Sequence, residues 1–106
     1  MRAKSRSSTT TKGSKPIVKE FQNPFHPGEI LLEEFLNPLG LSQAGFAEKC
    51  GWPPSKLNEI VRGRRGVTAE TAIVFSEALG TTARFWMNLQ SSWDLHQARL
   101  SRKDAA

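Results

Sequence analysis

The chain has 106 residues, of which 38% are hydrophobic, and a formal net charge of +5. This size allows one small domain, and this composition excludes a fully disordered protein. A single cysteine, Cys50, excludes an internal disulfide. No run approaches the roughly 20 apolar residues that a membrane span requires. No apolar stretch follows the basic first residues, so we expect a cytoplasmic protein with no membrane partner.

The composition of residues 1–22 predicts a flexible, disordered basic tail. The first 20 residues hold six basic side chains and one acidic side chain, so the whole charge surplus lies there, and the rest of the chain holds nine of each. This segment is rich in Ser, Thr and Lys and contains too little apolar surface to fold alone. The body is itself polarised, because residues 41–66 carry five basic and two acidic side chains. A basic face of this kind favours contact with phosphate groups.

The first predicted helix begins at Pro27, a residue that suits the first helical position. It ends near Leu36, because Pro38 and Gly40 follow and both interrupt a helix. Its apolar spacing predicts four inward-facing side chains, Ile30, Leu31, Phe35 and Leu36.

The second and third predicted helices form a helix-turn-helix. Ser42 caps the second helix, and Gly51 ends it at a bend that needs a left-handed backbone. The third helix begins at Pro53 or Pro54 and runs to about Arg62. Apolar contacts between the two helices come from Phe46, Leu57 and Ile60. The result is a short polar helix on a hydrophobic base, which the DNA major groove can admit.

The fourth and fifth predicted helices complete the domain. Thr68 and Thr82 cap them, and the fifth helix extends to about Arg99. Four residues of the fourth helix have the spacing expected for side chains that face the core, Ala72, Ile73, Ser76 and Leu79. Because no strand signal is present, the sequence predicts an all-α, five-helix domain over residues 23–100 and a C-terminal tail over residues 101–106.

Apolar side chains recur at helical spacing along the fifth helix, which is longer than so small a core requires. Phe85, Trp86 and Leu89 have the spacing of core residues. Trp93 lies further along, where five short helices offer less cover, and an exposed aromatic stripe at a helix end often marks a protein contact. We predict a homodimer that reads a palindromic DNA site through two recognition helices. Its interface would involve Trp86, Leu89, Trp93 and Leu100.

The sequence holds no motif for catalysis, for a metal, for a cofactor or for a small-molecule substrate. His26 and His96 lie far apart without a paired carboxylate motif, and we interpret each as a capping or surface residue. Cys50 occupies a usually apolar place at the turn and suits a small buried hydrophobe. Neither a glycine-rich phosphate loop nor a nucleophile elbow is present, so we predict a protein that is not an enzyme.

Several strings of residues carry a resemblance to a known family. They are residues 26–31, 38–42, 58–65 and 85–90, of which the last reads Phe-Trp-Met-Asn-Leu-Gln. Over about residues 24–99 the chain resembles the HigA antitoxins, which belong to the phage-repressor-like (XRE) helix-turn-helix proteins. The resemblance implies a dimeric bacterial repressor of its own toxin–antitoxin operon, nucleoid-associated when bound to DNA, that also neutralises a toxin. In this family the toxin is typically a HigB-like, ribosome-dependent mRNA endonuclease of the RelE type.

The resemblance and the chemistry of DNA together assign roles to eight polar residues. In the wider group, the first residue of the second helix contacts a phosphate, and here that residue is Gln43 beside the Ser42 cap. Ser55 and Lys56 should point into the major groove, with Lys56 toward a guanine. Asn58 suits an adenine or a phosphate, and nearby arginines would hold the flanking DNA backbone. The predicted DNA-binding residues are Ser42, Gln43, Ser55, Lys56, Asn58, Arg62, Arg64 and Arg65.

Two other functions also fit these residues. The chain could be a stand-alone helix-turn-helix transcriptional regulator without a toxin partner, or an interaction module whose tail folds onto a partner. The basic tail is longer than the short lead-in common in such antitoxins, and its composition suits phosphate or an acidic partner. A neighbouring RelE-like reading frame would distinguish an antitoxin from a stand-alone regulator.

Overall fold

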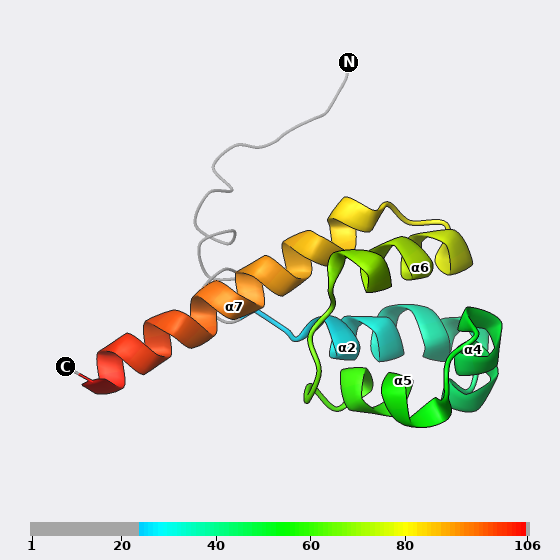
Figure 1. Ribbon diagram of the computed structural model, residues 1–106, viewed down its shortest axis with the longest axis horizontal. Coiled ribbons are helices and arrows are strands. Elements are labelled where there is room, and N and C mark those ends of the chain that lie inside the picture. Colours follow the sequence, from blue (N-terminus) through cyan, green and yellow to red (C-terminus); the bar gives the residue numbers. More distant parts are fainter. Residues whose placement is uncertain (1–23, 106) are drawn as a thin grey trace, which may run out of the picture.

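The computed structural model describes residues 24–105, so the predicted basic tail lies outside the described part of the chain. Within that range the chain forms five helices and no strand, which confirms the all-α fold (Figure 1). The first helix consists of three consecutive segments, α2 (Pro27–Ile30), the π-helical η2 (Leu31–Leu36) and α3 (Asn37–Leu39). The other four are α4 (Gln43–Cys50), α5 (Pro54–Val61), α6 (Ala69–Leu79) and α7 (Ala83–Ala105).

The first helix is longer than the sequence predicted, because Pro38 lies inside it rather than beyond its end. A proline lacks the backbone N–H that a helix uses, and its ring crowds the carbonyl one turn earlier. The wider π-helical turn of η2 directly precedes this position and relieves that crowding. The helix ends instead at Gly40, whose φ of 69° is left-handed and whose N–H donates to the Asn37 carbonyl at 3.1 Å.

The helix starts are set by the side-chain caps that the sequence predicted. Each cap oxygen accepts a hydrogen bond from the backbone N–H three residues later, which satisfies one of the free donors of the first turn. The three bonds join Ser42 to Gly45 at 3.0 Å, Thr68 to Thr71 at 3.2 Å and Thr82 to Phe85 at 3.0 Å. Gly51, with a φ of 74°, ends α4 as expected.

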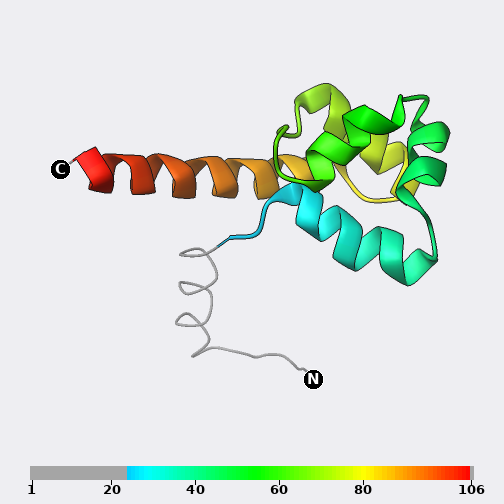
Figure 2. The ribbon, with the colours of Figure 1, turned by 90° about the horizontal axis from the view of Figure 1, so that it is seen from below.

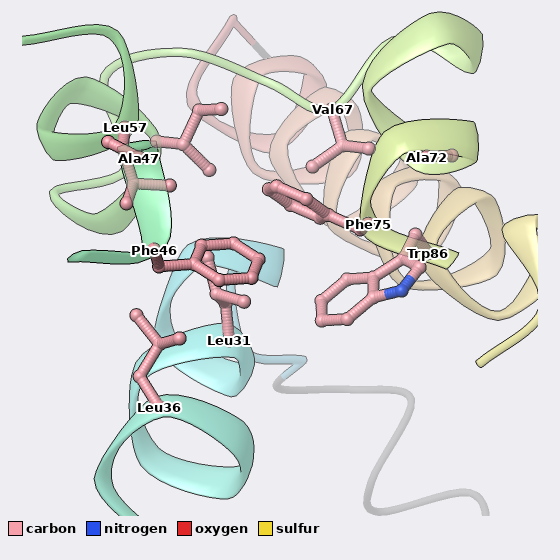
Figure 3. Packing of buried hydrophobic residues seen from close by; sticks show 10 residues of the cluster. Leu31, Leu36, Phe46, Ala47, Leu57, Val67, Ala72, Phe75 and Trp86 are labelled. Atoms are coloured by element: carbon pink, nitrogen blue, oxygen red, sulfur yellow. The ribbon is translucent and has the colours of Figure 1, made fainter. Parts of the chain in front are cut away.

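The hydrophobic core lies where all five helices meet, and Figure 3 shows its aromatic centre. Phe75 of α6 is fully buried, and its ring centroid lies 5.0 Å from that of Trp86 and 5.8 Å from that of Phe46. The expectation that Ile73 faces the core is wrong, because its side chain is 50% exposed. Ala72 is buried as predicted, and Leu79 packs against the core. The other buried residues of α6, Thr71 and Phe75, were not predicted.

Helix α7 has a packed half and a projecting half. Its first turns pack against α6 and α2, whereas its C-terminal part extends away from the other helices (Figures 1 and 2). The helix continues to Ala105, past the expected end at Arg99, so residues 101–105 are helical. Among the described residues, no helix combines the length and the apolar character that a membrane span needs.

Candidate nucleic-acid interface

Helices α4 and α5 form the predicted helix-turn-helix on a buried base. Phe46, Ala47, Leu57 and Ile60 join the two helices, and all four side chains are 0% exposed. In the turn between the helices the N–H of Trp52 donates to the Ala47 carbonyl at 2.9 Å. Because both contacting faces are fully buried, the outer face of α5 is held in a fixed direction.

The first helix supports α5 from the other side through Gly28. A Cβ atom at this glycine would lie 1.8 Å from the carbonyl oxygen of Ile60, so a larger residue could not fit without moving the backbone. This close approach brings the start of α2 against the C-terminal end of α5. The position of α5 is therefore set by backbone contact as well as by its apolar side chains.

Gln43 and Asn58, both predicted DNA contacts, are joined by a hydrogen bond. The Nδ2 group of Asn58 donates to Oε1 of Gln43 at 3.2 Å, which links the start of α4 to the middle of α5. This bond uses the acceptor of Gln43 and leaves its Nε2 group available as a donor, the form that a phosphate oxygen needs. The Ser42 hydroxyl is engaged by the Gly45 N–H, whereas Ser55 is exposed near the start of α5.

Lys56 does not extend into solvent but lies against Trp52. Its ammonium group is 4.2 Å from the centroid of the indole ring, a cation–π contact. Trp52 is half-buried in the turn between α4 and α5, and its ring lies 5.6 Å from that of Phe75. Sequence reasoning missed this tryptophan, although an aromatic residue four positions before a lysine was a readable signal. Trp52 thus connects the predicted guanine-contacting residue to the core.

The basic loop after α5 holds three arginines in different states. Arg65 donates from Nε and Nη2 to Oε1 of Glu59 at 2.9 and 2.6 Å, and both side chains are about half exposed. Surface pairs of this kind contribute only about 0–1 kcal/mol. Arg62 and Arg64 are exposed and have no carboxylate partner among the described side chains. They are therefore the loop cations whose charge is not neutralised within the fold.

Gln90 of α7 fixes the far end of this loop. Its Oε1 accepts a hydrogen bond from the N–H of Val67 at 2.7 Å, and its Nε2 donates to Oδ1 of Asp94 at 2.9 Å. Gly66 passes close to the same amide group. Sequence reasoning did not find this role, because Gln90 was visible only as the last residue of the Phe-Trp-Met-Asn-Leu-Gln string.

His26 is the N-cap of α2, which agrees with the prediction of a capping or surface residue. Its Nδ1 accepts from the Gly28 N–H at 2.9 Å, and its ring meets Trp93 edge-on with a centroid distance of 5.3 Å. Burial lowers the pKa of this histidine below its ordinary value, against the opposing influence of Asp94 and Glu29. Cys50 is half-buried, and burial raises the pKa of its thiol.

One residue of the predicted dimer interface is misplaced. Trp86 is 0% exposed and its Nε1 donates to Oγ1 of Thr81 at 2.7 Å. Its side chain therefore cannot contact a second subunit. The correction follows from its position in the packed half of α7. Leu89 and Trp93 are half-buried, and Leu100 is 44% exposed. Leu95, which the prediction omitted, is 52% exposed on the projecting half.

The sequence and the structure both have close relatives among known proteins. Residues 32–86 match the family described as Helix-turn-helix. Virulence-associated protein I of Dichelobacter nodosus is 42% identical over 88 residues, covering 83% of this chain and 82% of that protein. Antitoxin HigA-1 of Vibrio cholerae is 38% identical over 82 residues, covering 76% of each. The solved structure of Pseudomonas aeruginosa antitoxin HigA with the higBA promoter has a TM-score of 0.74 and 40% identity, covering 78% of this chain and 90% of that one.

These similarities define the class of the protein. The chain belongs to the helix-turn-helix family, whose members are DNA-binding regulators rather than enzymes. Within that family its relatives include the HigA antitoxins, which confirms the resemblance carried by the sequence strings.

Proposed function

We propose that this protein is the antitoxin of a type II toxin–antitoxin system, a sequence-specific repressor of its own operon that also neutralises a HigB-like mRNA endonuclease. The observation that carries the DNA-binding part is the α4–α5 unit, in which a polar helix face stands on four fully buried side chains. The relatives support it, because HigA of Pseudomonas aeruginosa was solved with the higBA promoter and antitoxin GraA with its operator.

In this proposal α5 enters the major groove and α4 contacts the DNA backbone. Gln43 offers its Nε2 donor to a phosphate, and the N-terminal N–H groups of α4 reinforce that contact. Ser55, Lys56 and Asn58 face the base edges, with Lys56 directed at a guanine. To reach the groove, the lysine leaves the Trp52 ring, which costs roughly 0.5–1 kcal/mol at an exposed site. The flanking phosphates are held by Arg62, Arg64 and Arg65.

The experiment that tests DNA recognition is fluorescence anisotropy on the DNA upstream of this gene and on scrambled DNA, across a salt series. A repressor should prefer the cognate sequence by about 10³-fold or more. Equal and steeply salt-dependent binding to both sequences would mean that the basic groups hold phosphate without reading bases, and would overturn the repressor role.

A homodimer follows from the same proposal. Leu89, Trp93 and Leu100 share one face of α7 and form the proposed interface. The exposed Leu95 lies about 140° around the helix from Leu100 and is not part of that face. Pairing of two such helices about a two-fold axis would place two copies of α5 about one DNA turn apart and match a palindromic operator. Analytical ultracentrifugation that finds only monomer at high micromolar concentration would remove the dimer.

The toxin partner is tested through the neighbouring reading frame. If that frame encodes a small RelE-like protein, its expression alone should arrest growth, and co-expression with this chain should restore growth and yield a co-purifying complex. Restored growth without a complex would contradict direct neutralisation. If no such frame exists and DNA recognition holds, the protein acts as a stand-alone transcriptional regulator.

A further inference from the structure

The loop that carries Arg64 and Arg65 is held by hydrogen bonds at both ends, and at its far end the Val67 side chain is also buried in the core. At the α5 end, the backbone N–H groups of both arginines donate to the carbonyl oxygen of Glu59, at 2.8 and 3.2 Å. At the other end, the N–H of Val67 donates to Oε1 of Gln90 at 2.7 Å. The second anchor comes from α7, a helix that supplies none of the predicted DNA contacts.

Gln90 is itself held in one orientation. Its Nε2 donates to Oδ1 of Asp94, one turn later on α7, at 2.9 Å. Because an amide has one donor side and one acceptor side, this bond directs Oε1 toward Val67. The Gln90 side chain therefore links α7 to the loop in one fixed orientation, because both its amide oxygen and its amide nitrogen are hydrogen-bonded.

The loop also packs directly against the amide group of Gln90. A Cβ atom at Gly66 would be 3.1 Å from Nε2 of Gln90 and 3.2 Å from its Oε1. A contact this tight requires the neighbour to move by a few tenths of an ångström. Gln90 cannot do so without lengthening its bond to Val67 or to Asp94. Glycine at this position therefore lets the loop approach the amide group.

We infer that Gln90 is a positioning residue for DNA binding, which holds the basic loop so that Arg64 and Arg65 reach the phosphates beside the recognition helix. The inference rests on the proposed function, because it assigns the two arginines to the DNA backbone. Gln90 itself touches no DNA in this arrangement. Its effect is on the order of the loop, and hence on the sequence-independent part of the binding energy.

The test compares Gln90→Met with Gln97→Met. Methionine keeps the length of the side chain and removes both hydrogen-bonding ends, and Gln97 is an exposed glutamine on the same helix that serves as the matched control. Three quantities are measured at 25 °C on the folded protein. They are hydrogen exchange of the Val67 amide without DNA, the Kd for cognate and scrambled DNA, and the salt slope of binding.

The expected result for Gln90→Met is faster exchange at Val67, by about tenfold or more, as one local bond is lost. The Kd for cognate and for scrambled DNA should rise together by about threefold to tenfold, and the salt slope should fall by about 1. Gln97→Met should leave the Val67 exchange and the salt slope unchanged. A residue that only stabilised the fold would lower the melting temperature and leave the salt slope unchanged, so an unchanged slope and Kd would overturn the inference.

Two further variants, Gln90→Glu and Gly66→Ala, test the same contact from its two sides. Gln90→Glu replaces the donor to Asp94 with a second carboxylate, so repulsion between the two should turn the side chain away and speed exchange at Val67. Slow exchange in this variant would contradict the role of the Asp94 bond. Gly66→Ala disturbs the same contact from the loop side and should reproduce the fall in salt slope even if Gln90→Met does not fold. If the wild-type protein shows no cognate preference, the proposed repressor function fails. The exchange data then still decide whether Gln90 orders the loop.

Discussion

Helices α5 and α7 are anchored in the same core but present different chemistry to the outside. The eight residues of α5 are held along their whole length by Leu57 and Ile60, both 0% exposed. The 23 residues of α7 are held only in their first half, where Trp86 is fully buried. The outer face of α5 is polar and the loop after it is basic, whereas the projecting half of α7 exposes two leucines, Leu95 and Leu100.

This difference shows how one small core can support two kinds of surface. A short helix fixed at every turn is suited to place donors at defined positions against DNA. The long α7 carries an apolar stripe of Leu89, Trp93 and Leu100, which share one face of the helix and extend onto its projecting half. Such a stripe suits contact with another protein surface. Changes to the shared core should therefore affect both surfaces, and changes to either outer face should affect one alone.

The largest effect is expected for the shared core. Trp86→Ala should lower the free energy of unfolding by about 3–5 kcal/mol, because it removes a fully buried indole and leaves a cavity beside Phe75. Chemical denaturation followed by circular dichroism measures the change. Leu95→Ala is the control on the same helix, since its side chain is 52% exposed and a surface change of this kind stays within about 0.5 kcal/mol. A small effect of Trp86→Ala would contradict the burial of this residue.

A smaller and selective effect is expected on the outer face of α5. Lys56→Ala should reduce the preference for cognate over scrambled DNA by about 1–3 kcal/mol, the value of one base contact. Arg64→Ala, at a residue assigned to phosphate, should weaken binding to both DNAs by a similar factor. Anisotropy titrations on both sequences separate the two patterns. Equal losses on both DNAs for Lys56→Ala would place this lysine on the backbone instead.

The projecting half of α7 is the subject of the third prediction. Leu100→Glu should raise the dimer dissociation constant by about tenfold or more, equivalent to about 1.4 kcal/mol. The cause is a charge placed on the apolar stripe. Ser101→Glu adds the same charge at the neighbouring exposed position and should have little effect. Sedimentation equilibrium measures both variants. An equal response to the two changes would assign the effect to charge alone and not to this leucine.

The helices and their caps could be predicted because their signals are local. Ser42, Thr68 and Thr82 act on N–H groups three residues away, so the sequence around each one determines the helix start. The end of the first helix could not be predicted in the same way, because Pro38 is accommodated by a π-helical turn that no pattern announces. Local sequence signals therefore predicted where helices start better than where they end.

Two other differences from the prediction came from contacts between distant segments. The core face of α6 was predicted only in part, since packing against Trp86 and Phe46 selects Phe75 over Ile73. Gln90 lies 23 residues from Val67 in the sequence. Such a pairing has no periodicity or motif, so it is visible only once α7 is docked beside the loop.

The smallest expected effect concerns His26, which packs against α7 and lies near the residues that follow α5. Its ring meets Trp93 of α7 edge-on, and a Cβ at Gly63, just after α5, would lie 3.7 Å from the ring. Burial lowers the pKa of His26 in the folded protein below its ordinary value of 6.5. The unfolded chain therefore binds a proton more readily than the folded one as the pH falls past 6.5. Protonation at Nδ1 would also remove the acceptor that caps α2.

Stability should thus be complete above the ordinary pKa and should fall as the pH drops from there toward the lower folded-state pKa, with no further loss from this group below it. Urea denaturation across this pH range measures the change. His26→Asn is the matched variant, because asparagine can cap the Gly28 N–H and does not titrate. The difference in stability between the two proteins should shift with pH in favour of the variant under acidic conditions. A pH-independent difference would mean that His26 titrates alike in the folded and unfolded states, and that its contact with α7 does not respond to protonation.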